Sequence, residues 1–232
     1  MNQPTFCFFH IGSDISCPQM LVNSIRKFNT NPEIIYCTDS QSPDIKGVTH
    51  RLNFDGSPNE IMAFRLDSFA KSGINRPAIY LDTDMLCLKT FNPATVLENK
   101  DLYICERSFG KSLLFNGNFR GMNYLEYDQM PLGEVYPYLA CTTITKNSEI
   151  WVELADLCGG LSEKFRIWYG DQEVLKIISK RKSNKQLGFI SEHTYACLPE
   201  YSDYAPYATF LHFKGMARKG LMEKVYKKIM SF

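Results

Sequence analysis

Two aspartates, separated by one residue, are the side chains of this sequence best suited to chemistry. Asp82 and Asp84 follow the run Pro-Ala-Ile-Tyr-Leu at residues 77–81, whose composition favours a buried strand of a mostly parallel sheet. In open α/β sheets a ligand lies just beyond the carboxyl ends of the strands. Two carboxylates this close repel each other unless a cation or strong donors lie between them. The pattern is typical of a Mg²⁺ or Mn²⁺ site, although an acidic turn that caps the next segment has the same sequence.

A third metal ligand is predicted near the C-terminus. His212 lies in the run Phe-Leu-His-Phe at residues 210–213, and its neutral imidazole would complete a site with the two aspartates. A histidine buried in the core is the alternative for such a run. Gly215, followed by the cations Arg218 and Lys219, favours the ligand role, because the backbone at a glycine and nearby positive charges suit phosphate oxygens.

Composition limits the class of protein. The chain has 232 residues, of which 44% are hydrophobic and 22% charged, and a net charge of +1 that argues against nucleic acid as the main partner. No apolar run approaches the about eighteen residues of a membrane-spanning helix, and the first five residues lack signal-peptide features. The eight cysteines include no C-x-x-C pair, so buried reduced thiols are expected. We therefore expect a cytoplasmic protein.

The first 90 residues alternate between strand and helix patterns in the order β-α-β-β-α-β, which is typical of a doubly wound nucleotide-binding fold. Ser57, Pro58 and Glu60 have the spacing of a capping box at the start of the second helix. The predicted elements are strands at 5–11, 34–37, 48–52 and 77–84, and helices at 18–28 and 57–71. The carboxyl ends of the first two strands predict a nucleotide pocket formed by His10, Gly12, Thr38 and Asp39. Turn capping is the alternative role for Thr38 and Asp39.

The second half of the chain is less regular. Strands are predicted at 101–105 and 139–145 and helices at 148–157 and 171–180, with a long aromatic-rich stretch at 109–138. Its rings would suit a carbohydrate acceptor or would form a satellite hydrophobic cluster. Because no repeat or linker is present, we expect one domain over residues 1–232.

Four motifs, in this order along the chain, resemble those of the GT-A fold nucleotide-sugar glycosyltransferases, most closely family 8 and its relatives. Arg65 matches an arginine of the family that contacts the nucleotide sugar, and Tyr-Leu-Asp-Thr-Asp-Met at 80–85 resembles its metal-binding strand end. Gly-Asp-Gln-Glu-Val-Leu at 170–175 is similar to its "DQD-x-L" helix start, and His-Phe-Lys-Gly at 212–215 to its "H-F-x-G-x-x-K" segment.

The resemblance implies an α/β protein with a Rossmann-like, mostly parallel sheet flanked by helices. Residues 1–105 would form its nucleotide-sugar-binding half, and residues 106–232 its acceptor-binding and C-terminal half. The implied activity is metal-dependent transfer of a hexose from a UDP-sugar, with UDP-glucose or UDP-galactose favoured, to a hydroxyl of a glycan, glycolipid or glycoprotein, with retention of configuration. The implied metal ligands for Mn²⁺ or Mg²⁺ are Asp82, Asp84 and His212, and the implied catalytic residues are Asp171 and Gln172. The predicted donor-binding residues are His10, Gly12, Thr38, Asp39, Arg65, Asp82, Thr83, Gly215 and Arg218. The resemblance makes the nucleotide pocket at the ends of the first two strands a uridine pocket.

Other interpretations remain open from the sequence. Residues 139–143, Leu-Ala-Cys-Thr-Thr, replace the family's Asn-Ala-Gly-type strand, and Arg218 stands where a lysine is usual. Asp171 would suit a helix cap and Arg65 a surface ion pair. The alternatives for function are an inverting transferase, a haloacid-dehalogenase-like phosphatase and a non-catalytic nucleotide-sugar-binding module. Residues 219–232 have the pattern of a basic amphipathic helix, which would either contact a membrane peripherally or pack on the protein itself.

Overall fold

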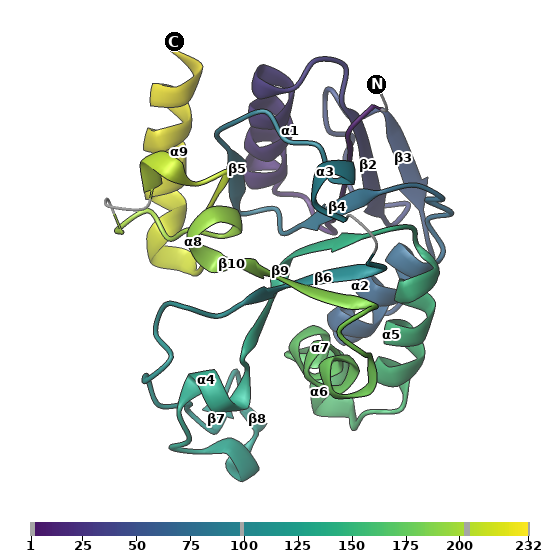
Figure 1. Ribbon diagram of the computed structural model, residues 1–232, viewed down its shortest axis with the longest axis vertical. Helices are drawn as coiled ribbons and strands as arrows, with labels where there is room; N and C mark the ends of the chain where they lie inside the picture. The colour runs from purple at the N-terminus through teal and green to yellow at the C-terminus, as the bar shows by residue number, and fades with distance from the viewer. Residues whose placement is uncertain (1–2, 98–99, 202–204, 232) are drawn as a thin grey trace.

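The computed structural model describes residues 3–97, 100–201 and 205–231, and is organised around a central seven-stranded sheet (Figure 1). The strand order is β10-β6-β9-β4-β1-β2-β3. Strand β9 is antiparallel to both of its neighbours, whereas the other neighbouring pairs are parallel, so the predicted mostly parallel α/β sheet is confirmed. The strands are β1 (Thr5–Phe9), β2 (Glu33–Thr38), β3 (His50–Asn53), β4 (Ala78–Leu81), β6 (Leu102–Glu106), β9 (Tyr138–Thr145) and β10 (Leu187–Ser191).

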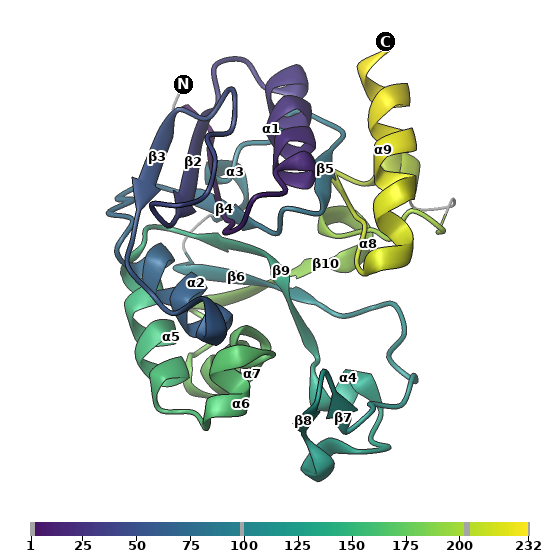
Figure 2. The same ribbon diagram turned by 180° about the vertical axis from the view of Figure 1, so that it is seen from behind.

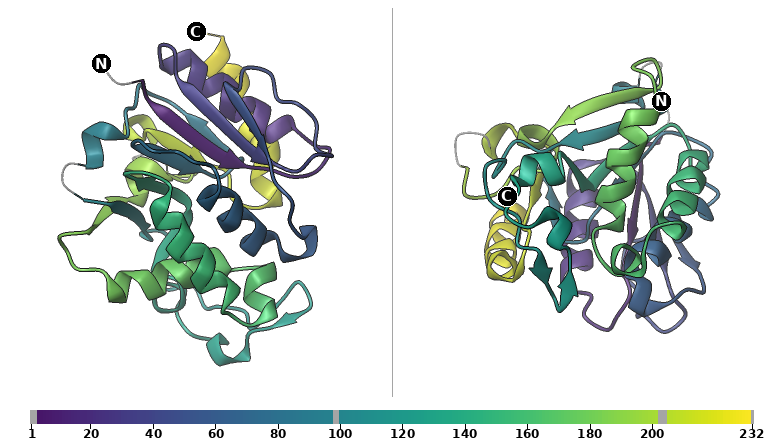
Figure 3. Two further views of the ribbon diagram at one scale, coloured as in Figure 1. Left: turned by 90° about the vertical axis from the view of Figure 1, so that its right-hand side faces the viewer. Right: turned by 90° about the horizontal axis from the view of Figure 1, so that it is seen from below.

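Helices cover both faces of this sheet (Figures 1 and 3). Side chains alternate along β1: Phe6 and Phe8 pack with helix α1 (Ser16–Phe28), whereas Cys7 and Phe9 point to the opposite face. That opposite face is covered by α2 (Ile61–Ala70), α5 (Glu149–Gly159) and α7 (Gly170–Arg181). A strand with apolar residues on both faces is what a sheet between two helical layers requires. The predicted order of the first 90 residues is thus confirmed.

The start of α2 differs from the sequence prediction. Pro58–Glu60 forms a 3₁₀ turn (η1), α2 begins at Ile61, and the Ser57 side chain makes no capping hydrogen bond. The Glu60 carboxylate instead pairs with Arg166, whose Nε lies 2.8 Å from Oε1. The predicted capping box is therefore wrong, because a distant arginine takes the carboxylate that would have closed it.

The predicted strand at 77–84 is shorter than expected, and a further strand that was not predicted follows it. Strand β4 ends at Leu81, and after a turn β5 (Met85–Cys87) pairs antiparallel with β11 (Phe210–His212) in a separate two-stranded sheet. The turn between β4 and β5 carries both aspartates. Strand β11 was not predicted, since its three residues are too few to produce a period-two pattern.

Residues 109–137 project away from the sheet as a separate lobe, seen clearly from behind (Figure 2). It contains β7 (Asn118–Phe119), β8 (Met122–Asn123), the turn η2 (Leu125–Tyr127) and α4 (Leu132–Val135). Phe115, Tyr124 and Tyr136 are buried there against Phe165. We call this segment the aromatic lobe. Most of its rings pack on one another, so the satellite cluster is the better description of them.

Four further helices complete the chain. They are α3 (Ala94–Leu97), α6 (Glu163–Ile167), α8 (Glu192–Tyr195) and α9 (Met216–Met230), with the turn η3 (Ala205–Tyr207) between the last two. Met222 of α9 is buried, and Val225 and Tyr226 pack beside it against residues of α1. The Tyr226 hydroxyl also accepts a hydrogen bond of 2.7 Å from Asn23. The apolar stripe predicted at 219–232 therefore packs on the protein itself.

Among the described residues, no helix has the length and apolar character needed to cross a bilayer. All eight cysteines are free thiols, and all except Cys17 are buried, as the sequence predicted. The burial of seven of the eight thiols agrees with the expectation of buried cysteines.

Candidate active site

The candidate site lies where β4 ends. The Asp82 amide donates a 2.9 Å hydrogen bond to the Cys141 carbonyl of β9, which fixes the point at which the chain leaves the sheet. Three residues later, β5 pairs with β11 so that Met85 lies opposite His212. The Phe213 amide donates to the Asp84 carbonyl at 2.8 Å. This pairing brings a histidine from the C-terminal segment beside two aspartates that precede it by about 130 positions in the printed sequence.

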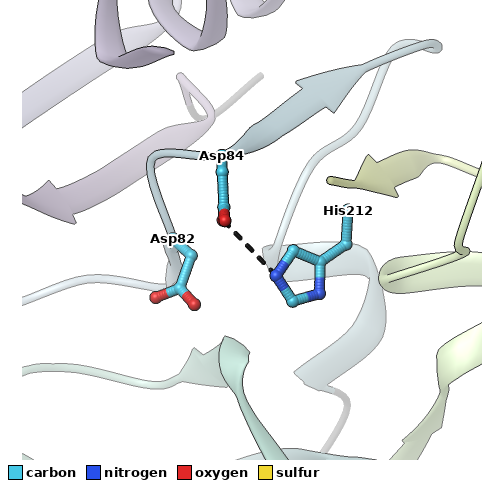
Figure 4. Close-up of side chains that lie close together, drawn as sticks. All are labelled: Asp82, Asp84 and His212. Atoms are coloured by element: carbon cyan, nitrogen blue, oxygen red, sulfur yellow. Dashed lines mark ion pairs between the residues drawn. The ribbon is translucent and has the colours of Figure 1, made fainter. Parts of the chain in front are cut away.

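Asp82, Asp84 and His212 form one cluster (Figure 4). Each offers a ligand atom, and these atoms all lie within 4.8 Å of one another. The His212 Nε2 lies 3.3 Å from Asp84 Oδ1. Two carboxylates and an imidazole match the ligand preferences of Mn²⁺, and the carboxylates those of Mg²⁺, so the residues present fit a divalent ion. The three ligands predicted from sequence are therefore brought together.

The buried histidine changes the acid–base properties of this cluster. Burial opposes protonation of His212, but the Cys141 thiol and the Asp84 carboxylate beside it raise its pKa well above the ordinary value. Burial also opposes ionisation of Asp84, yet its hydrogen bond to His212 and the positive charges of His212 and Lys219 lower its pKa. Without a metal, the pair is thus stabilised as imidazolium and carboxylate.

Arg65 is buried, with 8% of its surface exposed, and joins two parts of the site. Its Nη1 lies 2.7 Å from Asp82 Oδ1 and 3.2 Å from Asp171 Oδ2, and its Nη2 donates to the Ala140 carbonyl at 2.9 Å. Burial raises the pKa of Asp171 even though Arg65 acts in the opposite direction. The surface ion pair considered for Arg65 is therefore wrong, because the guanidinium is an internal link between β4, β9 and α7.

The start of α7 has an unusual backbone. Tyr169 precedes it in the left-handed conformation, with φ of 66°. At Gly170 a Cβ atom would lie 2.2 Å from the Phe165 carbonyl oxygen, so only glycine fits. The Tyr169 ring stacks on Tyr136 with centroids 4.9 Å apart. These contacts hold Asp171, whose Oδ1 accepts from the Gln172 amide at 2.8 Å.

Gln172 contacts a residue that the sequence analysis did not single out. Its Oε1 accepts a 3.2 Å hydrogen bond from Nη2 of Arg107, which directly follows β6. Lys214 and Cys141 are two further residues of the site that sequence reasoning missed as candidates in their own right. The positions of two of them in the sequence could have identified them as site residues, since Arg107 follows a predicted strand end and Lys214 lies between His212 and Gly215.

The residues predicted for the uridine pocket gather at the ends of β1 and β2. The His10 amide donates to the Cys37 carbonyl at 3.1 Å, while its Nε2 is buried with no hydrogen-bond partner among the described residues. Gly12 has φ of 111°, and its amide donates to the Ser42 hydroxyl at 2.8 Å. Burial lowers the pKa of His10, so this imidazole is neutral at physiological pH.

Thr38 and Asp39 have partners within the protein. The Thr38 hydroxyl donates to the Tyr36 hydroxyl at 2.9 Å. Asp39 Oδ1 accepts from the amides of Gln41 and Ser42 at 3.1 and 2.7 Å. Asp39 thus makes the turn-capping interaction that was the alternative to nucleotide binding, and it holds the loop after β2 beside Gly12.

The two cations near the C-terminus differ in their surroundings. Arg218 pairs with Glu200, through Nε to Oε2 at 3.0 Å, and donates to the Lys214 carbonyl at 2.7 Å. The charge of Lys219 instead lowers the pKa of Asp84 and of Asp14. Gly215, with φ of 86°, directly precedes α9, and Thr83 is half-buried in the turn between the two aspartates. Of Arg218 and Lys219, Lys219 is therefore the one whose charge acts on Asp84.

No protein-family model matches the sequence, and no curated protein does. Solved structures do match the fold. One is a glycosyltransferase involved in glycosylation of the major capsid of PBCV-1, with 11% identity and a TM-score of 0.62 over 96% of this chain and all of that one. Another is the galactosyltransferase LgtC in complex with donor and acceptor sugar analogs, with 14% identity and a TM-score of 0.61 over 98% of this chain and 95% of LgtC.

The glycosyltransferase GlyE of Streptococcus pneumoniae TIGR4 matches the whole chain, at 14% identity and a TM-score of 0.61, although the chain spans only 61% of GlyE. At these identities the likeness concerns the fold. The chain is thus a mixed α/β domain with a mostly parallel seven-stranded sheet, and it has the fold of glycosyltransferases of known structure.

Proposed function

We propose that the protein is a metal-dependent glycosyltransferase of the GT-A fold, similar to family 8. It would move a hexose from a UDP-sugar to a hydroxyl of a glycan, glycolipid or glycoprotein, and UDP-glucose and UDP-galactose are the first donors to test. One observation carries this proposal. Asp82, Asp84 and His212 offer ligand atoms within 4.8 Å of one another at the carboxyl edge of a sheet whose fold is that of glycosyltransferases.

The donor would lie across the site from the uridine pocket to α7. Asp82, Asp84 and His212 would hold Mn²⁺ or Mg²⁺, and the bound ion supplies positive charge for a leaving diphosphate. The backbone at Gly215 and the ammonium of Lys219 suit phosphate oxygens, with Arg218 held by Glu200 as a second cation nearby. The uridine would contact His10, Gly12, Thr83 and the loop that Thr38 and Asp39 order. This placement of the uridine is inferred from the position of its contact residues at the carboxyl ends of the strands.

The sugar would lie near the start of α7. Both carboxylate oxygens of Asp171 have partners, since Oδ1 accepts from the Gln172 amide and Oδ2 from Arg65. An inverting enzyme needs a carboxylate that is free to take a proton from the acceptor hydroxyl. The engagement of Asp171 therefore supports transfer with retention, in which Asp171 and Gln172 position the sugar and Arg65 positions Asp171.

We further propose a cytoplasmic location, which the eight free thiols support. Peripheral membrane contact through α9 would depend on its exposed residues, because its apolar stripe is packed against α1. Among the α9 side chains that the structure describes, Leu221 and Met230 are large apolar residues that are exposed, 39% and 40% accessible, beside several lysines. Co-sedimentation with anionic liposomes, compared between the chain and a form lacking residues 221–232, would test this contact.

The activity is tested by assaying UDP-glucose and UDP-galactose for sugar release, with Mn²⁺ and with a chelator. Metal-dependent release of sugar and UDP is expected. Release of phosphate from a phosphomonoester would indicate the phosphatase alternative, and UDP-sugar binding without turnover a non-catalytic module. A donor at one hundred times its Kd should raise the free energy of unfolding by about 2.7 kcal/mol, which thermal denaturation measures independently of turnover. No Mn²⁺-dependent stabilisation by UDP would contradict the proposal.

A further inference from the structure

Arg107 is a buried cation without a carboxylate partner. It is 4% exposed, and its guanidinium donates to the Tyr136 carbonyl at 2.7 Å and to Gln172 Oε1 at 3.2 Å. Both acceptors are neutral, and within residues 3–97, 100–201 and 205–231 Arg107 forms no ion pair. Buried charges in proteins are normally paired, because an uncompensated charge away from water has a large desolvation cost. An unpaired buried arginine beside Gln172, a predicted catalytic residue, therefore indicates that a negatively charged ligand binds here.

Glu192 is the acidic residue whose charge acts most strongly on Arg107, but its carboxylate is engaged by backbone amides. Its Oε2 accepts a 2.7 Å hydrogen bond from the Phe109 amide, and a second from the Ser108 amide. The carboxylate therefore anchors the backbone that follows Arg107. Burial lowers the pKa of Arg107, and the negative charge of Glu192 offsets this only in part. Glu192 thus holds the loop in place and leaves the guanidinium without an anion in contact.

The position of Arg107 separates it from the expected diphosphate. Arg107 follows β6, which lies two strands from β4 in the sheet order, beyond β9. The predicted uridine pocket at β1 and β2 lies on the opposite side of β4. The contact with Gln172 places Arg107 beside the residues expected to face the sugar. The planar fork of an arginine binds a carboxylate through two parallel hydrogen bonds.

We propose that Arg107 binds a carboxylate carried by a sugar substrate of this enzyme. The carboxylate would belong to a uronic acid, either at C6 of the donor hexose or in the acceptor. This inference rests on the proposed glycosyltransferase function and specifies its substrate class. Gln172 would then be oriented by Arg107 on one side and would face the bound sugar on the other.

Calorimetric titration of sugar ligands in the presence of Mn²⁺ distinguishes a carboxylate on the donor hexose from one on the acceptor. In one arm UDP-glucuronate and UDP-galacturonate are compared with UDP-glucose and UDP-galactose. In the other, glucuronate and galacturonate are compared with glucose and galactose on protein saturated with UDP and Mn²⁺. A preference of at least tenfold for the carboxylate is expected in one arm. The preference for the carboxylate should be lost in R107Q and partly kept in R107K. It should be unchanged in the control R181Q, which lies at the exposed end of α7.

The affinity for UDP itself provides the internal control. It should stay within about twofold in R107Q, because a tenfold loss corresponds to about 1.4 kcal/mol and would mean that Arg107 contacts the diphosphate. A tenfold loss for UDP, or no preference of the wild type for a carboxylate in either arm, would overturn the assignment of Arg107. Since the wild-type comparison needs no substitution, it decides the question even if R107Q does not fold. Failure of the wild type to bind UDP would instead refute the proposed function.

Discussion

The Nη1 atom of Arg65 lies 2.7 Å from the Asp82 carboxylate. The same atom lies 3.2 Å from Asp171, so one guanidinium connects the end of β4 to the start of α7. It therefore fixes the distance between the candidate metal site and the residues expected to face the sugar. Lysine has no planar fork and cannot reproduce these contacts together with the bond to the Ala140 carbonyl.

Substitution of Arg65 should affect stability and activity together. R65M leaves two carboxylates without their buried cation, and removal of one partner from such a pair destabilises by about 3–5 kcal/mol. R65K should be more stable than R65M but should also lose donor turnover. Urea denaturation and a donor-hydrolysis assay measure the two effects. Wild-type turnover in R65K would show that the contacts of the guanidinium with Asp82, Asp171 and the Ala140 carbonyl are not all needed.

The variants D82N and D84N should fold and lose metal-dependent donor turnover. Both side chains are at the end of a strand and partly exposed, at 30% and 23%, and asparagine preserves their shape. A neutral amide binds Mn²⁺ far more weakly than a carboxylate does, so we expect at least a tenfold loss of Mn²⁺ affinity. The control is D156N on the exposed face of α5. Near-normal Mn²⁺-dependent activity in either variant would rule out these ligands.

His212 should matter for UDP binding only when metal is present. H212A removes the imidazole that lies 3.3 Å from Asp84, and we expect weaker UDP binding with Mn²⁺ and little change with a chelator. Calorimetric titration of UDP into both proteins under both conditions measures this difference. An equal loss in the two conditions would mean that His212 packs or contacts the nucleotide, and would leave the two aspartates as the only supported ligands.

Lys219 should contribute more to UDP binding than Arg218. The guanidinium of Arg218 is engaged by Glu200 and by the Lys214 carbonyl, whereas the charge of Lys219 acts on Asp84. We expect K219A to weaken UDP binding by about fivefold, corresponding to about 1 kcal/mol, and R218A to weaken it less. Raising the salt concentration should reduce the effect of K219A, because an exposed charge is screened. A larger loss in R218A would reverse the assignment.

Gly170 should tolerate no side chain. A Cβ there would meet the Phe165 carbonyl oxygen at 2.2 Å, and such overpacking typically costs about 1–3 kcal/mol. G170A should therefore lower thermal stability and, by shifting Asp171 and Gln172, lower turnover. G159A is the matched control, since nothing lies within 4 Å of its Cβ position in α5. Equal stability of the two variants would show that the start of α7 adjusts freely.

The sequence by itself determined the order of the elements and the candidate metal ligands. Apolar runs with β-branched residues and helical periodicity are local features, so the β-α-β-β-α-β order of the first 90 residues followed from spacing alone. Asp82 and Asp84 were also recognisable, because two carboxylates directly after a buried strand repel each other unless a cation or strong donors lie between them. His212 was favoured as a ligand because a glycine and two cations follow it and because its motif resembles one of a known family, since nothing in its own run, Phe-Leu-His-Phe, separates a ligand from a core histidine.

Only the tertiary structure decided which polar groups face one another. The pairing of β5 with β11 places His212 beside Asp84, and the antiparallel insertion of β9 between β4 and β6 sets Arg107 two strands from Asp82. In the folded protein Arg65 is an internal link that contacts Asp82. The Glu60 carboxylate pairs with Arg166 and closes no capping box, and Arg218 pairs with Glu200. Local spacing specifies helices and strands, but the partner of a charge depends on long-range register and on burial, which a single sequence does not encode in any short pattern.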